Sequence, residues 1–207
     1  MTVDLAIACT CGGLRGKLRA ISPGAGARYV CHCKDCQAFI HFLKRQSDVL
    51  DENAGTEVFQ TRPSRLTITD GGDQLKCIRM TDKPTLRWFA GCCNSPLFNT
   101  TPSGRYPFLS VICHCTDPDL RDGAMGPVLG HLSVTEATGD MTGKTEAGGT
   151  RMLLSVVYRM VRERLSGRHK DTPLFDPVTG APVVVPDSLD PADRETVDAA
   201  VARATGQ

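Results

Sequence analysis

Cysteine is the residue type most able to do chemistry in this 207-residue chain, which contains ten of them. Three thiols fall within six residues, in the segment Cys31-His32-Cys33-Lys34-Asp35-Cys36. Thiolates spaced one or two residues apart converge on one point where the backbone turns, as a tetrahedral zinc site requires. We therefore expect Cys31, Cys33 and Cys36 to hold a metal ion, rather than to be free thiols in the core.

Two further groups of cysteines complete a second expected site. Cys9 and Cys11 are followed directly by two glycines, which permit a tight turn. This pair needs two more thiols to close a zinc site, and the adjacent Cys92 and Cys93 can supply them. Because adjacent cysteines are awkward ligands for one ion, recruitment of Cys113 or Cys115 is an alternative. Cys77 stands alone, and we expect it to be buried and inert.

The number of ligands separates two kinds of zinc site. Four protein ligands make a closed, structural site, whereas three leave a coordination position for water or substrate. The central segment has no obvious fourth thiol. His32 should project away if both of its neighbours face the metal, which leaves His41 and Asp35 as possible fourth ligands.

Composition excludes several functional classes. The net charge is +1, with 41% hydrophobic and 23% charged residues, so nothing favours binding to nucleic acid or to a membrane surface. Residues 1–8 do not resemble a signal peptide, and the longest apolar tract, Met152 to Val161, is interrupted by polar residues. We expect a cytoplasmic protein. Thiols stay reduced there, which favours metal ligation over disulfides.

The elements that must position these cysteines fall into three parts, which we predict as domains. Residues 1–115 hold every cysteine and form a zinc-binding β domain, 116–149 a loop or linker with one possible strand, and 150–207 a helical extension that packs on the β domain. The chain is thus expected to be mainly β, and α+β overall. Short β-like runs lie at Leu14–Ile21, Arg28–Val30, Glu57–Gln60, Leu66–Thr69, Gln74–Met80 and Leu86–Ala90.

Turn and helix signals complete this prediction. Gly71-Gly72-Asp73 favours a hairpin turn, and Gln37–Leu43 a short helix after the central cluster. In the last part, apolar residues recur at helical spacing between Thr150 and Gly167, and Asp190-Pro191 favours the start of a second helix. Val197, Ala200 and Val201 would form the buried stripe of this second helix.

Four motifs, in this order, resemble the glutathione-dependent formaldehyde-activating enzyme (GFA) family, also called the CENP-V/GFA domain family. They cover about the first half of the chain: Cys9-Thr10-Cys11-Gly12-Gly13-Leu14-Arg15-Gly16, Cys31-His32-Cys33-Lys34-Asp35-Cys36-Gln37, Gly55-Thr56-Glu57-Val58-Phe59 and Cys93-Asn94-Ser95-Pro96-Leu97-Phe98. The resemblance implies a zinc-stabilised complex β fold like that of Mss4. It also implies two zinc ions per chain, one structural and one labile or catalytic.

The resemblance further implies a function. The reaction associated with the family is addition of glutathione's thiol to formaldehyde, formally a carbon–sulfur lyase reaction. The expected partner is a small thiol or a thiol–aldehyde adduct such as S-hydroxymethylglutathione, whose carboxylates Lys34, Lys44 or Arg45 could meet. The sequence assigns no catalytic residue. The alternative is a non-catalytic zinc-structured binding or scaffold domain, with the central site closed or purely structural.

Three departures from the family pattern place the chain in a divergent branch. The family's later C-x-x-C-G pair has Ala90 at its first cysteine and Asn94 at its glycine. The usual Gly-Ser after the central cluster is replaced by the bulkier segment from Ala38 to Phe42. The C-terminal helical part is additional.

Overall fold

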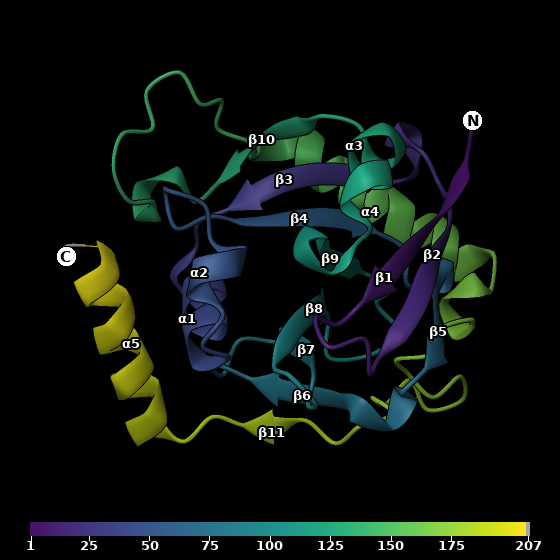
Figure 1. Ribbon diagram of the computed structural model, residues 1–207. Helices are drawn as coiled ribbons and strands as arrows, with labels where there is room; N and C mark the ends of the chain where they lie inside the picture. The colour runs from purple at the N-terminus through teal and green to yellow at the C-terminus, as the bar shows by residue number, and fades with distance from the viewer. Residues whose placement is uncertain (206–207) are drawn as a thin grey trace.

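The computed structural model describes residues 1–205 as two β-sheets with helices around them (Figure 1). A three-stranded antiparallel sheet has the order β1-β2-β5. An eight-stranded sheet has the order β10-β3-β4-β9-β8-β7-β6-β11, in which only the two edge strands, β10 and β11, pair in parallel. The strands span Val3–Ala8 (β1), Arg15–Ile21 (β2), Ala27–Cys31 (β3), Thr56–Thr61 (β4), Leu66–Asp70 (β5), Leu75–Arg79 (β6), Leu86–Ala90 (β7), Ser95–Thr100 (β8), Leu109–Ile112 (β9), Val128–Leu132 (β10) and Asp187–Ser188 (β11).

The α-helices lie mostly outside the sheets. They span Lys34–Phe42 (α1), Gln46–Val49 (α2), Pro118–Met125 (α3), Gly149–Leu165 (α4) and Pro191–Thr205 (α5). Figure 1 shows α5 beside α1 and α2, and α4 behind the strands. The prediction of a mainly β chain that is α+β overall is therefore confirmed. Within the described residues, no helix is both long enough and apolar enough to cross a membrane.

Most strands lie where the sequence pattern predicted them, but four were not predicted, namely β1, β8, β9 and the two-residue β11. The strands β8 and β9 are buried along their whole length, so they lack the alternation that marks a half-buried strand. Pro96 inside β8 also argues against a strand on sequence grounds. The edge strand β1 was missed as well. The region 116–149 contains α3 in addition to its one strand, β10.

The expected hairpin at Gly71-Gly72-Asp73 is wrong, although the turn exists. Gly71 adopts the left-handed conformation, with φ of +65°. The flanking strands, however, join different sheets, because β5 pairs with β2 and β6 pairs with β7. A side chain at Gly71 would place its Cβ 1.8 Å from the carbonyl oxygen of Gly13, so this turn packs directly against the first cysteine loop.

Two hydrophobic clusters form the core. The larger includes Trp88 and Phe98 and draws on both sheets. The smaller packs α1, through Phe39 and Ile40, against the large sheet and against Val201 of α5. Each fully buried large apolar side chain contributes roughly 1.5–3 kcal/mol through removal from water. The core thus fixes β7, β8 and α1, the elements that carry or adjoin the cysteine groups.

The two C-terminal helices, α4 and α5, differ in how far their apolar side chains are buried. Val201 of α5 is buried and Val197 is partly buried against the smaller cluster, whereas Ala200 is half-exposed. In α4 the spacing that predicted the helix is correct, but Leu153, Val157 and other members of its apolar stripe face solvent. Residues 206 and 207 of the expected extension lie outside the described residues.

Candidate metal centres

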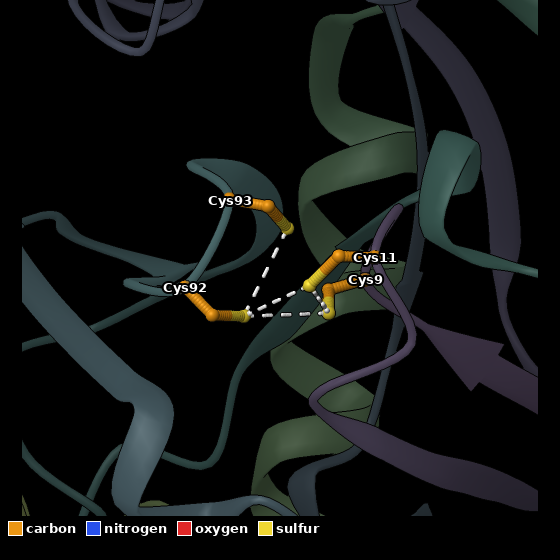
Figure 2. Close-up of side chains that lie close together, drawn as sticks. All are labelled: Cys9, Cys11, Cys92 and Cys93. Carbon is orange, nitrogen blue, oxygen red and sulfur yellow. Dashed lines mark hydrogen bonds between the residues drawn. The ribbon is translucent and has the colours of Figure 1, made fainter.

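The first cysteine group joins two distant loops. Cys9 and Cys11 lie between β1 and β2, and Cys92 and Cys93 lie between β7 and β8 (Figure 2). The Sγ atom of Cys92 is 3.6 Å from that of Cys9, 3.3 Å from that of Cys11 and 3.9 Å from that of Cys93. All four sulfurs lie within 4.8 Å of one another. We call Cys9, Cys11, Cys92 and Cys93 the four-thiol cluster.

Backbone conformation explains how the loops bring these thiols together. A Cβ atom at Gly13 would lie 3.2 Å from the Sγ of Cys92 and 3.4 Å from that of Cys11, so this position must remain small. Asn94, which stands where the GFA sequence pattern has a glycine, adopts the left-handed conformation with φ of +54°. Asparagine tolerates this region better than most residues do. Asn94 therefore supplies the turn that lets the adjacent Cys92 and Cys93 face one point.

The alternative ligands for this cluster lie elsewhere. Cys113 and Cys115 are buried in the larger core cluster, and the Sγ of Cys113 lies 3.8 Å from the sulfur of Met125. Burial raises the pKa of Cys115 to about 12 and that of the buried Cys77 also to about 12. These thiols remain protonated at neutral pH. Ala90, which stands where the later C-x-x-C-G motif of the GFA pattern has its first cysteine, is a fully buried core residue.

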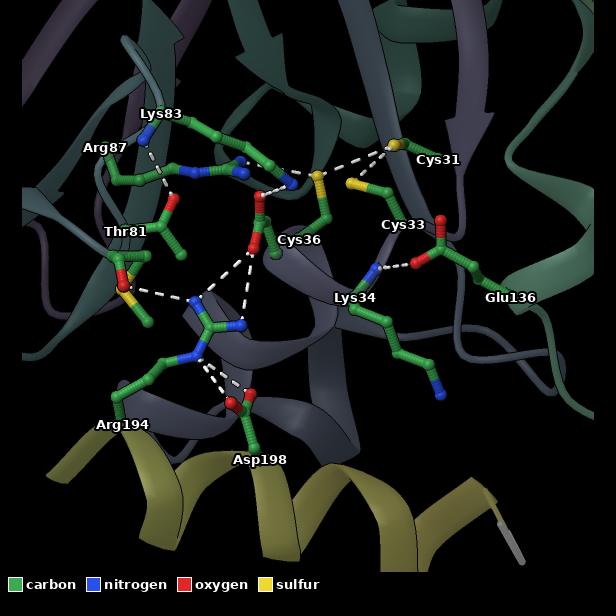
Figure 3. Close-up of polar contacts among 12 residues, drawn as sticks. Cys31, Cys33, Lys34, Cys36, Thr81, Lys83, Arg87, Glu136, Arg194 and Asp198 are labelled. Atoms are coloured by element: carbon green, nitrogen blue, oxygen red, sulfur yellow. Dashed lines mark hydrogen bonds and ion pairs between the residues drawn. The ribbon is translucent and has the colours of Figure 1, made fainter. Parts of the chain in front are cut away.

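The second group lies where β3 runs into α1. Cys31 ends β3, Cys33 is the N-cap residue of α1, and Cys36 lies in its first turn. The Sγ of Cys31 is 3.4 Å from that of Cys33 and 3.5 Å from that of Cys36 (Figure 3). These three sulfurs also lie within 4.8 Å of one another. We call Cys31, Cys33 and Cys36 the three-thiol cluster.

Both clusters have the dimensions of a tetrahedral zinc site. A Zn–S bond of about 2.3 Å in tetrahedral geometry requires sulfurs roughly 3.8 Å apart. Six of the nine sulfur–sulfur distances within the two clusters range from 3.3 to 3.9 Å, and all nine are within 4.8 Å. Thiolate donors also suit zinc by their chemical softness. Both clusters can therefore hold a metal ion, the first with four ligands and the second with three.

His32 does point away from the three-thiol cluster. Its Nδ1 lies 3.0 Å from the carbonyl oxygen of Asn53, and its Nε2 lies 3.0 Å from Nδ1 of His131. The ring is fully buried, and a Cβ at Gly55 would lie 2.6 Å from its Cε1. Gly55, the first residue of the segment Gly55–Phe59 that resembles the GFA pattern, thus makes room for this histidine.

The other two possible fourth ligands do not join the thiols. Asp35 pairs with Nζ of Lys83 at 2.8 Å and with the guanidinium of Arg194 at 3.3 Å. His41 lies at the opposite end of α1 from the cysteines. Within residues 1–205, the metal-ligand grouping at this site contains three thiols and no carboxylate or imidazole.

Sequence reasoning missed Arg87, a buried cation beside the three-thiol cluster. Its guanidinium donates to the Sγ of Cys36 at 3.3 Å and to Oδ1 of Asn99 at 3.0 Å. It also lies 5.7 Å from the centre of the Phe39 ring, a cation–π distance. Arg87 belongs to β7, 51 residues after Cys36 in sequence, so no local pattern indicates the contact. The bulky segment after the cluster, through Phe39, therefore supports this arginine.

The three thiols ionise in an order set by their neighbours. Hydrogen bonds with Cys31 and Cys33, together with the charge of Arg87, hold the pKa of Cys36 well below its usual range. Hydrogen bonds with Cys33 and Cys36, with burial, raise the pKa of Cys31. The N-terminus of α1 adds its positive partial charge at this point. These neighbours therefore favour the thiolate form of Cys36 over that of Cys31.

The N-terminus of α1 is capped from a distant loop. Cys33 occupies the N-cap position but its side chain makes no capping hydrogen bond. Instead, Oε2 of Glu136 accepts from the backbone N–H of Lys34 at 2.7 Å, and the amide of Gln37 donates to the carbonyl oxygen of Glu136. The thiol of Cys33 thus stays with the other two thiols while a carboxylate satisfies the helix end.

The cations expected near the central segment have separate positions. Arg45 donates to Oγ1 of Thr10 at 2.6 Å, which places it beside the four-thiol cluster rather than the three-thiol cluster. The backbone N–H of Lys34 takes part in the cap described above. Lys44, with φ of +56°, follows the end of α1.

Comparison with known proteins assigns the chain to a family without a known activity. A family of unknown function (DUF6151) matches residues 1–185. The chain belongs to this family. No curated protein matches it. Among solved structures, a crystal structure of a Rhodobacter sphaeroides protein, a structural genomics target, is similar over 59% of this chain and 96% of that chain, with 18% identity and a TM-score of 0.40.

Within this DUF6151 chain, the matched region includes both thiol clusters, Arg87 and α4, and ends before α5. The helix α5 is attached to α1 through Arg194, which pairs with Asp35 and also donates to the carbonyl oxygen of Met80 at 3.1 Å. Arg194 pairs with Asp198 on its own helix at 2.8 Å as well. The terminal helix thus holds the residue that directly precedes Cys36.

Proposed function

We propose that this protein is a zinc-dependent carbon–sulfur lyase of the GFA/CENP-V type, acting on a small thiol–aldehyde adduct such as S-hydroxymethylglutathione. The observation that carries the proposal is the convergence of three thiols, without a fourth ligand among the described residues, at the N-terminus of α1. A site with three protein ligands leaves one coordination position for a small molecule.

A zinc ion in this position supplies a Lewis acid that accepts a sulfur or oxygen donor and polarises a carbonyl group. The protein's own residues make the site suitable for such a donor. Three thiolates carry three negative charges, which repel the thiolate or carboxylate of a substrate. Arg87, which donates to the Sγ of Cys36, and the N-terminus of α1 offset part of this charge.

The two clusters would then have different roles, with two zinc ions per chain. The four-thiol cluster joins the loop after β1 to the loop after β7, and thereby holds the two sheets together. Such a closed site contributes folding energy and no chemistry. A cytoplasmic location would keep all seven thiols reduced and able to bind metal.

A second candidate function is a zinc-structured scaffold without catalysis. The observation that favours it is the degree of enclosure of the central segment. Cys36 is buried, and Glu136 and Gln37 attach the loop after β10 to the first turn of α1. If this enclosure leaves no room at the metal, the site only shapes the fold.

Exchange spectroscopy of formaldehyde with glutathione tests the proposal. Zinc-loaded protein should accelerate formation of the adduct, and Cys33→Ser should abolish the acceleration while removing one of two zinc ions. Cys77→Ser, which alters a buried thiol outside both clusters, is the matched control and should keep activity and metal. Two bound zinc ions without any acceleration would leave the scaffold function instead.

A further inference from the structure

Helix α4 presents its apolar side chains to solvent and a charged one to the interior. Leu153 and Leu154 are each 61% exposed, and Leu165 is 83% exposed. On the inner side, Glu163 is completely buried, with Oε2 3.6 Å from the guanidinium of Arg62. A surface helix usually turns its apolar residues inward, but here only some of them, such as Met152 against the smaller core cluster, do so. The outer face of α4 therefore has the apolar character of an interaction surface.

The size of this apolar face is that of a protein interface. The exposed apolar residues of the helix are accompanied by Tyr106, from the loop after β8. Together they expose on the order of 800 Å², about the area that each partner contributes to a standard-size interface. Monomeric proteins seldom expose apolar patches beyond a few hundred Å². The set consists of Tyr106, Leu153, Leu154, Val157, Tyr158, Val161 and Leu165.

We propose that a second copy of this chain covers this face, with the two α4 helices packed antiparallel about a two-fold axis. Leu153, Val157, Val161 and Leu165 follow one another at intervals of four residues, so they form one ridge along the helix. Reversing the helix exchanges Leu153 with Leu165 and Val157 with Val161. The order of side chains along the ridge (Leu, Val, Val, Leu) is therefore the same in both directions. An interface with two-fold symmetry requires a surface that is complementary to itself in this way.

A groove beside the ridge fits the same arrangement. Tyr106, Pro107 and Leu165 line an apolar cavity of about 290 Å³ next to the C-terminal half of α4, together with Val157 and Val161. In an antiparallel pair, this half faces the N-terminal half of the other helix. Leu153 and Leu154 of the second copy are thus placed to enter the groove, and the exchange is mutual.

The charges on α4 also favour an antiparallel pair over a parallel one. Arg162 and Arg164 are exposed in the C-terminal half of the helix, and its acidic residue, Glu163, is buried. A parallel pair would place these arginines beside their own copies. An antiparallel pair places them at opposite ends, beside Leu153 and Leu154 of the other chain.

Sedimentation equilibrium of the full zinc-loaded protein tests this inference. We expect a dimer with a dissociation constant on the order of 1 µM or tighter. Val161→Glu should yield a monomer with unchanged zinc content and circular dichroism, and Leu153→Glu provides a second such variant at the other end of the ridge. Val185→Glu is the matched control, because Val185 is 86% exposed and lies outside α4, and this variant should remain dimeric.

Two results would overturn the inference. One is a wild-type protein that stays monomeric across the concentration range, and the other is a dimer that persists in both α4 variants. Binding of a monomeric wild-type protein to phosphatidylglycerol vesicles, lost in Val161→Glu, would assign the face to an anionic membrane instead. None of these outcomes depends on the reaction at the three-thiol cluster.

Discussion

Replacement of Arg87 by methionine should weaken metal binding at the three-thiol cluster without removing a ligand. The guanidinium donates to the Sγ of Cys36 at 3.3 Å inside the protein, where its charge is little screened. A hydrogen bond to a charged group contributes about 1.5–3 kcal/mol, and each 1.4 kcal/mol is tenfold in affinity. We therefore expect roughly 10- to 100-fold weaker zinc binding in Arg87→Met, the range found when a group supporting a metal ligand is lost.

The same change should alter the pH dependence of metal release. Arg87 is one of the causes that lower the pKa of Cys36, so its removal raises that pKa and lets protons compete at higher pH. The midpoint of zinc release on acidification should move upward. Competition with a chromogenic chelator at several pH values measures both effects, and cobalt substitution shows whether thiolate coordination is retained.

Two variants separate charge from packing. Arg87→Lys keeps the positive charge but lacks the planar guanidinium, whose Nη1 donates to both Cys36 and Asn99, so it should recover part of the affinity. Arg79→Met makes the same substitution on the neighbouring strand β6 and should leave affinity unchanged. If Arg87→Met folds and binds zinc within about threefold of the wild-type protein, the guanidinium only fills space and the reasoning above is wrong.

Three further predictions concern stability. Cys11→Ser should lose one zinc ion and about 3 kcal/mol of the free energy of unfolding. In calorimetry this loss should lower the melting temperature by roughly 6–12 °C. Because Asn94 has φ of +54°, Asn94→Gly should be tolerated, whereas Asn94→Val should cost about 1–2 kcal/mol in urea denaturation. Folding raises the pKa of Cys77 and Cys115 to about 12 from an unfolded value near 8.5, so the folded chain keeps protons that the unfolded chain releases. Stability should therefore fall as the pH rises above about 8.5 in thermal melts, and both thiols should resist alkylation at neutral pH.

The fold and the clusters could be predicted from sequence to different degrees. Local spacing was enough for Cys31, Cys33 and Cys36, because a strand that turns directly into a helix brings them together within one segment. Alternation was enough for several strands with one solvated face, but not for β1, whose residues alternate between buried and exposed. It failed for β8 and β9, which are buried on both faces and thus have no polar side to mark the period.

Contacts between distant segments could not be read from one sequence. The turn at Gly71 has the chemistry of a hairpin, yet its flanking strands find better partners in two different sheets. Arg87 reads as an ordinary position in β7, because its partners, Cys36 and Phe39, lie on α1. Periodicity in α4 predicted a helix correctly but did not reveal which side faces the sheet. Those features depend on tertiary packing, which overrides local preference.

The strand β7 connects the two clusters and suggests that they are coupled. Arg87 lies three residues, roughly 10 Å of extended strand, before the end of β7 at Ala90, and Cys92 follows in the adjoining turn. A metal ion bound at the four-thiol cluster would therefore fix the end of β7, the strand whose middle places the Arg87 guanidinium against Cys36. If that end loosens, Arg87 loses part of its fixed position, and the three-thiol cluster should bind zinc more weakly. The Cys11→Ser variant should accordingly show weaker binding at the remaining site, and binding free energies make such coupling reciprocal. Unchanged affinity at that site in Cys11→Ser would show that Phe39 and Asn99 hold Arg87 without help from the four-thiol cluster.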